Sequence, residues 1–147
     1  MKITILAALG FLLLFSSCRK NNDASALTGS WRLIEVFDKN TNLVSYHPPL
    51  SNMDVVITFL DGSRFAGHTL RNSLTEGSYK QTGSEIIFKN FSMTKIAEEE
   101  WGESFITVLN SCSLQASVPC ASSKISIQGN IMKITSPLRF DITLERL

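Results

Sequence analysis

Short apolar runs separated by turn residues are the feature that most constrains how this 147-residue chain can fold. Their length is ordinary for strands and short for helices. The clearest run is the last, in which every second residue from Leu138 to Leu144 is apolar and the residues between them are polar or charged. Such alternation buries one face of a strand and leaves the other in water. The sequence therefore predicts an antiparallel β structure.

Glycine turns are expected to join these strands into hairpins. Asp61-Gly62 is a strong signal, because both central residues of a type I′ turn need a positive φ. Thr82-Gly83 and Gly129-Asn130 indicate two further hairpins. The predicted strands are 31–37, 54–60, 64–69, 78–81, 85–88, 124–128, 131–135 and 138–145.

One segment departs from the strand pattern, because Ala97, Trp101, Phe105 and Leu109 recur at every fourth position. This spacing predicts an amphipathic helix over 97–110 that packs on the sheet. The acidic triplet 98–100 falls in its first turn, where carboxylates interact favourably with the helix dipole. Carboxylates for acid–base work or for a cation are the alternative interpretation. The fold class predicted is mainly β (α+β), with one packed α-helix.

The first eighteen residues have the organisation of a lipoprotein export signal. Lys2 gives a positive n-region, and 3–15 is an apolar stretch too short to span a bilayer comfortably. Two serines then precede Cys18, and 14–18 resembles a bacterial lipobox. That resemblance implies lipidation of Cys18 with a diacylglycerol and an acyl chain such as palmitate, and two or more chains anchor a protein stably. A plain signal peptide or an uncleaved anchor is the alternative.

The leader divides the chain into three parts. Residues 1–17 are the predicted lipoprotein signal peptide, 18–26 the lipidated tether and 27–147 a single domain. Arg19 rather than Asp follows the cysteine, and by resemblance to known sorting rules this implies the outer membrane of a bacterial envelope. The periplasmic and surface faces both stay open.

Charge and cysteine usage limit the partners. The signal holds one Lys and no acid, so the rest of the chain carries thirteen basic and thirteen acidic residues. A nucleic-acid binder is expected to show a basic excess, so no nucleic-acid partner is predicted.

Cys112 and Cys120 remain as a pair in a compartment that permits disulfides. His47 and His68 are not at zinc-like spacing from them, which favours a disulfide over a metal, and no cofactor is predicted.

An ordered set of short motifs resembles the META/HslJ-like domain family of bacterial lipoproteins. The set begins with Gly29-Ser30-Trp31 and continues through Asp61-Gly62 and 64–67 to Gly77-Ser78-Tyr79, Met93-Thr94-Lys95 and the helix, so that it covers 27–147. The resemblance implies a compact antiparallel meander forming a partly open barrel-like sheet with one packed helix. Family members often carry Gly-Cys-Asn after the second hairpin strand, whereas here Gly67 is followed by His68-Thr69 and the asparagine is Asn72.

Three residues are candidates for binding. Trp31 is expected either to plug one end of the sheet or to offer a stacking platform to a ligand. His68 is either structural or a pH-sensitive, ligand-contacting group. Tyr79 belongs to the Gly-x-Tyr strand. Tyr46-His47-Pro48-Pro49 is a rigid, partly apolar loop that either punctuates the chain or presents a binding edge.

No catalytic motif emerges from the sequence, which contains neither a Gly-x-Ser-x-Gly elbow nor a phosphate-binding glycine loop. We expect a non-catalytic binding or envelope-assembly module, which the family resemblance relates to stress. The lipid would attach it to the membrane, and an exposed edge or the 112–120 loop would bind an envelope protein. The alternatives are a carrier of a small apolar ligand such as a lipid, and an inhibitor of a foreign enzyme.

Overall fold

The structure is a computed structural model that describes residues 24–47, 54–110, 112 and 120–147. The predicted signal peptide 1–17, Cys18 and most of the tether lie outside the described residues. Within the described part, no helix is both long enough and apolar enough to cross a membrane.

The described residues form one antiparallel sheet. Eight strands follow one another around it in the order β1-β3-β4-β5-β6-β8-β9-β10, while β2 pairs at the edge of β1 and β7 pairs with β5. The strands are β1 (Gly29–Asp38), β2 (Leu43–Tyr46), β3 (Val56–Leu60), β4 (Arg64–His68), β5 (Ser73–Thr82), β6 (Glu85–Phe88), β7 (Ser92–Met93), β8 (Ser123–Gln128), β9 (Ile131–Thr135) and β10 (Phe140–Arg146).

The eight-stranded sheet is a closed barrel. The last strand returns to the first, so that β10 pairs with β1 from Trp31 opposite Arg146 to Asp38 opposite Phe140. The narrowest seam joins β6 to β8 through two residue pairs, and the chain between these strands carries the helix. The predicted mainly β meander with a packed helix is confirmed. The barrel is closed rather than partly open, because strands from the two ends of the domain hydrogen-bond along their length.

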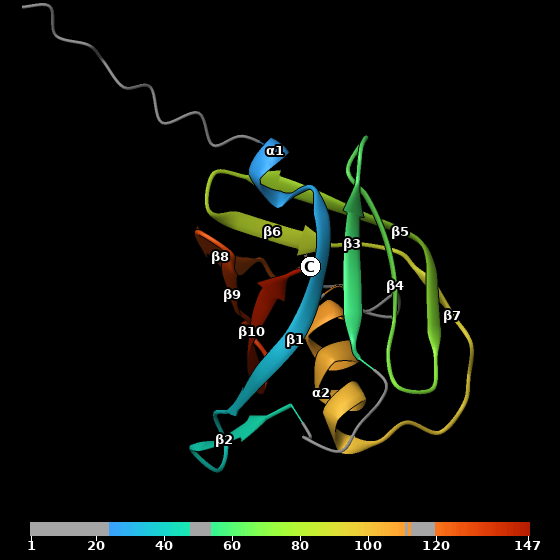
Figure 1. Cartoon of the computed structure of the whole chain (residues 1–147), viewed down its shortest axis with the longest axis vertical. Coiled ribbons are helices and arrows are strands. Elements are labelled where there is room, and N and C mark those ends of the chain that lie inside the picture. Colours follow the sequence, from blue (N-terminus) through green and yellow to red (C-terminus); the bar gives the residue numbers. More distant parts are fainter. Residues whose placement is uncertain (1–23, 48–53, 111, 113–119) are drawn as a thin grey trace, which may run out of the picture.

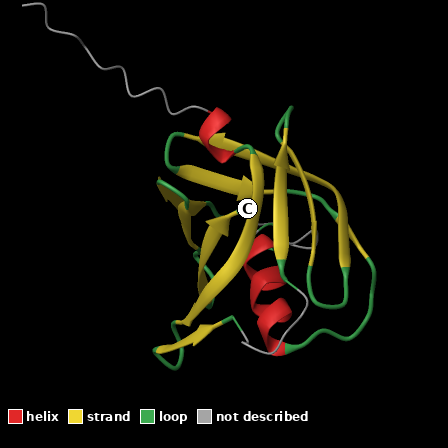
Figure 2. Cartoon of the chain, viewed as in Figure 1, coloured by secondary structure: helices red, strands yellow, loops and turns green. Residues whose placement is uncertain are grey.

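Two helices accompany the barrel, α1 (Ala24–Leu27) and α2 (Glu100–Leu109). Figure 1 shows α1 at the end of the barrel where β1 begins, and α2 in the other half, beside the later part of β1. Figure 2 shows the same arrangement, with α2 among strands and α1 at the tip. The helix predicted over 97–110 is confirmed with a later start at Glu100, and α1 occupies part of the predicted tether.

Large side chains fill the inside of the barrel. Phe59 packs edge-to-face with Tyr79 at a centroid distance of 5.2 Å, and Phe65 does so with Phe88 at 5.6 Å. A closed eight-stranded barrel has an interior that side chains can fill completely. The largest fully buried side chains are Trp31, Phe59, Phe65, Phe88, Phe105, Leu27, Leu33, Ile57, Leu74, Ile86, Leu109 and Met132.

The turns differ in part from their predicted types. Leu60 pairs with Arg64, so the β3–β4 loop has three residues, and the positive φ values fall on Gly62 and Ser63. The two-residue type I′ turn predicted at Asp61-Gly62 is therefore wrong. At Gly129-Asn130 the loop does have two residues, and Gly129 has a positive φ.

Strand β10 also departs from strict alternation. Leu138 precedes the strand and is 37 % exposed, so it is not the buried residue that the pattern predicts. Asp141 is buried instead of wet. Its carboxylate accepts a hydrogen bond of 3.0 Å from the Ser136 backbone and lies 3.2 Å from the Lys39 ammonium. These two partners compensate for the loss of solvation, because a buried carboxylate needs hydrogen bonds or a counter-ion.

Candidate functional site

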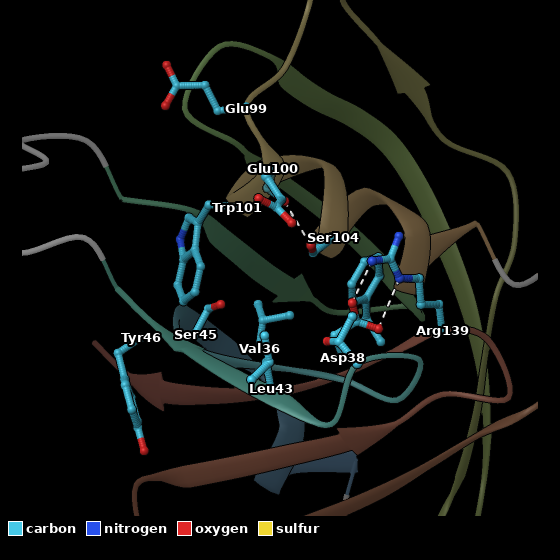
Figure 3. Close-up of a pocket in the computed structure, with 12 residues that line it drawn as sticks. Val36, Asp38, Leu43, Ser45, Tyr46, Glu99, Glu100, Trp101, Ser104 and Arg139 are labelled. Carbon is cyan, nitrogen blue, oxygen red and sulfur yellow. Dashed lines mark hydrogen bonds and ion pairs between the residues drawn. The ribbon is translucent and has the colours of Figure 1, made fainter.

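A surface cavity of about 380 Å³ lies between the β1–β2 hairpin, the start of α2 and the start of β10. We call it the hairpin hollow. Figure 3 shows side chains from these three elements around a common space, with Glu99 and Tyr46 directed outward at its margin. The residues that line it are Val36, Asp38, Thr41, Leu43, Ser45, Tyr46, Glu99, Glu100, Trp101, Ser104, Arg139 and Phe140.

The hollow has an apolar floor and an exposed apolar wall. Val36 and Phe140 are buried, and Trp101 on α2 is 8 % exposed. On the opposite wall Leu43 is 65 % exposed and Tyr46 70 % exposed. Large apolar side chains that gather in the open beside a cavity mark a binding surface more often than scattered ones do.

The Asp38–Arg139 pair forms one charged rim of the hollow. Arg139 donates two hydrogen bonds to the Asp38 carboxylate, at 3.0 and 2.5 Å, and its guanidinium lies 4.6 Å from the centroid of the Phe140 ring. The hydrogen bond from Arg139 holds the pKa of Asp38 well below its usual range. The pair is bidentate, so each charge already has its partner.

Two glutamates form the other rim. Glu99 accepts a hydrogen bond of 2.7 Å from Arg71 outside the hollow. Glu100 makes no ion pair with any described residue. The pKa of Arg139 is raised mainly by its hydrogen bond to Asp38, and the charge of Glu100 adds a smaller effect. Among the charged residues that line the hollow, Glu100 is therefore the one without an ion-pair partner in the described part of the chain.

The polar groups that line the hollow are carboxylates, hydroxyls and one guanidinium. Its described lining holds neither histidine nor cysteine, and the Ser104 hydroxyl donates to the Glu100 backbone oxygen at 2.7 Å. Nor do the described residues include a cluster of three or more potential metal ligands.

Strand β2 adds an open sheet edge next to the hollow. It pairs with β1 through four residues, from Glu35 opposite Tyr46 to Asp38 opposite Leu43. Among the described strands none pairs with its outer edge. All four β2 residues are exposed. An exposed edge of this kind can accept a further strand.

The structure places the candidate Trp31 inside the barrel. The side chain is fully buried, and its Nε1 donates to the Leu27 backbone oxygen at 2.8 Å. The Arg146 guanidinium lies over the ring at 4.2 Å from its centroid. Trp31 is thus the predicted plug at one end, and its burial does not suit a stacking platform.

The candidates Tyr79 and His68 lie away from the hollow. Tyr79 is buried in the barrel, where burial first and the charge of Asp61 second raise the pKa of its hydroxyl. His68 is exposed at the end of β4, with its Nδ1 3.3 Å from the Thr69 oxygen. The structure does not bring the three predicted binding residues together.

The acidic triplet is divided between different roles. Glu98 precedes the helix and accepts hydrogen bonds from Thr69 and, at 2.8 Å, from Asn72; we call these three residues the carboxylate latch. Asn72 also binds the backbone of Ile96, as donor and acceptor at 2.9 Å each. Gly102 leaves room for the latch, because a Cβ there would lie 2.5 Å from the Glu98 carboxyl carbon. The triplet is therefore not simply a set of solvated dipole partners.

Cys112 and Cys120 lie at disulfide distance, with Cα atoms 4.5 Å apart. This geometry permits the predicted pairing. Most of the loop between them lies outside the described residues, so its predicted role as a binding edge stays a prediction.

Comparison with known proteins finds structures of similar fold and indicates no activity. No protein-family model and no curated protein matches the chain. An NMR structure of a protein from Burkholderia xenovorans is similar at a TM-score of 0.60 and 16 % identity, over 84 % of this chain and 85 % of that chain. A crystal structure of a duf4847 family protein from Bacteroides vulgatus is similar at 0.55 and 15 %, over 81 % and 92 %. At these identities the likeness concerns the fold alone, and the META resemblance stays a prediction.

Sequence reasoning missed the hollow as a unit. Its walls come from three segments, and the sequence singled out only parts of them: the aromatic face of the helix, the acidic triplet 98–100 and the loop beginning at Tyr46. Strand β2 went unpredicted, although Leu43-Val44 between polar residues was a short apolar signal. Nothing in the local sequence indicates that Arg139 would lie opposite Glu100.

Proposed function

We propose that this protein is a lipid-anchored, non-catalytic binding module of the bacterial envelope that captures a protein partner at the hairpin hollow. The observation that supports the proposal best is the juxtaposition of the hollow with the exposed side chains of Leu43 and Tyr46 on an open sheet edge. Exposed edges and apolar pockets beside them are used together in strand-addition recognition.

The filled interior favours this proposal over an apolar-ligand carrier. A lipid chain inside the barrel needs space that Phe59, Phe65 and Phe88 occupy, and each of these is at most 1 % exposed. Protein interiors are close-packed, so a barrel filled in this way holds no ligand without rearrangement.

Site-specific photo-cross-linking in living cells tests the proposal. The photoreactive amino acid p-benzoylphenylalanine replaces Tyr46 in one strain and Lys133, an exposed residue of β9, in the control strain. We expect a discrete protein adduct from position 46 and none of that mass from position 133. No adduct at position 46, or the same adduct at both positions, would contradict the proposal.

The anchor has its own test. Cells grown with radiolabelled palmitate should label the wild-type protein, and Cys18→Ser should abolish the label. Label that persists in Cys18→Ser would show that Cys18 is not the lipidated residue. Cys112→Ser controls for loss of a cysteine elsewhere in the chain.

A further inference from the structure

We propose that the hairpin hollow receives a lysine or arginine side chain from an extended polypeptide segment that pairs with the outer edge of β2. This inference rests on the proposed function and deepens it by naming the chemistry of the partner. It combines the charge of the hollow, its apolar lining and the direction of the open strand.

The charge of the hollow favours a cation. Arg139 is occupied by Asp38, and Arg71 by Glu99, which leaves the carboxylate of Glu100 without a counter-ion among the described residues. An anionic ligand would have to displace Asp38 from a bidentate pair, whereas a cationic side chain finds Glu100 available. Charge complementarity of this kind selects partners and sets their register.

The apolar lining suits the long stem of lysine or arginine. Such side chains bury their methylene groups on apolar surface and keep the charged end near polar groups. Val36, Leu43 and Phe140 provide that surface, and Trp101 provides an aromatic ring beside Glu100 on α2. A cation near the face of a tryptophan is also attracted by the ring.

The open strand supplies the backbone partner. Leu43 and Ser45 are two residues apart on β2 and both line the hollow. Side chains of neighbouring strands share a face with period two, so a segment added to β2 places every second side chain on the side of the hollow. One basic residue in such a segment can therefore enter the hollow while the backbone pairs with β2.

The two tryptophans of the chain give a direct readout. Protein labelled with ¹⁵N-tryptophan has two indole resonances, from Trp31 and Trp101. Trp101 lines the hollow, whereas Trp31 is buried at the other end and bonded to Leu27, so it is an internal control. The full-length protein in mild detergent is titrated with a blocked pentapeptide of sequence Thr-Val-Lys-Val-Thr, and with two analogues that carry norleucine or glutamate in place of lysine.

We expect the lysine peptide to shift the Trp101 indole resonance, to leave that of Trp31 in place, and to bind about fivefold more tightly than the norleucine peptide. In Glu100→Gln this preference should disappear, whereas Glu103→Gln, an exposed position on the same helix outside the hollow, should keep it. An unshifted Trp31 resonance in each variant verifies that the fold is intact.

Three outcomes would overturn the inference: no Trp101 shift with the lysine peptide, equal affinity for the lysine and norleucine peptides, or a preference that survives in Glu100→Gln. A cross-link from position 46 together with any of these would leave the proposed function standing with a partner of different chemistry. The two proposals therefore fail independently.

Discussion

At the scale of single residues, Gly77 shows how packing between neighbouring strands fixes a residue type. The ring of Phe65 on β4 lies directly over Gly77 on β5, and a Cβ at Gly77 would lie 2.5 Å from the ring. The two residues also face each other in the strand register. Gly77 is therefore required by packing, in the Gly-x-Tyr segment that the sequence singled out.

Gly77→Ala should reduce the free energy of unfolding by about 1–3 kcal/mol, because the ring or the strand must move to admit the methyl group. Chemical denaturation monitored by tryptophan fluorescence measures the change. Lys80→Ala, an exposed substitution on the same strand, serves as the control and should stay within about 0.5 kcal/mol of the wild type. A Gly77→Ala protein as stable as the control would mean that the ring has room to shift.

Glu98 is the second informative residue, because its ionisation contributes to folding. Burial tends to raise the pKa of its carboxyl, but hydrogen bonds from Thr69 and Asn72 outweigh this effect and lower the pKa. A group whose folded pKa is depressed stabilises the fold above its unfolded pKa of about 4.3, and this stabilisation is lost as the pH falls through the folded value.

Glu98→Gln should therefore destabilise the protein most near neutral pH, by about 1–2 kcal/mol, because hydrogen bonds to a charged acceptor are lost. The difference from the wild type should shrink as the pH falls below about 4. Urea unfolding at a series of pH values gives both curves. Glu103→Gln on the exposed face of α2 is the matched control and should follow the wild-type curve. A difference in stability that does not depend on pH would argue against the carboxylate latch.

At the scale of elements, helix α2 joins the barrel to the hollow. Its buried residues include Phe105, Val108 and Leu109, which belong to the same core as the strands, while Glu99, Glu100 and Trp101 at its start line the hollow. The carboxylate latch holds the segment just before the helix. The position of the hollow's rim thus depends on how α2 packs.

Phe105→Ala should destabilise the protein by about 3–5 kcal/mol, because the fully buried ring leaves a cavity between helix and sheet. It should also weaken binding at the hollow, since the start of α2 loses its support. Thermal unfolding with calorimetry measures the first effect, and Thr107→Ala on the same helix is the control. A loss below about 1 kcal/mol would show that the helix is not anchored through this ring.

At the scale of the whole molecule, closure of the barrel brings the two ends of the domain together. Arg146 near the C-terminus donates hydrogen bonds to the backbone oxygens of Thr28 and Ala26, at 2.9 and 2.5 Å, and stacks on Trp31. We call this set the Arg146 clasp. It fastens α1, and hence the point where the predicted tether meets the domain, onto the closed barrel.

Arg146→Ala should loosen the segment from Ala24 to Trp31 while the barrel stays folded. Hydrogen–deuterium exchange followed by mass spectrometry should show about tenfold faster exchange in that segment, and unchanged exchange in β4 and β5. Arg64→Ala, which removes an exposed arginine from β4, is the control for the loss of charge. Exchange as slow as in the wild type would mean that strand pairing alone holds α1.

The sequence by itself determined the local structure of this protein. Alternation placed β6 and β9 at the residues where they are observed, and the four-residue spacing placed Trp101 and Phe105 on the buried face of α2. These features depend on periods and turns within one segment, so neighbouring residues specify them. The mainly β class with one packed helix follows from the same signals.

Only the tertiary structure decided the closure of the barrel, the burial of Asp141 and the assembly of the hollow. Each depends on groups from distant segments. β10 pairs with β1, and the Lys39 ammonium compensates the charge of Asp141. Asp38 pairs with Arg139, so Glu100 has no ion-pair partner among the described residues. A local pattern does not specify which distant segment will pair with it. The strands and the helix could therefore be predicted from the sequence. The candidate site could not, because it forms only where the hairpin, the helix and the last strand meet.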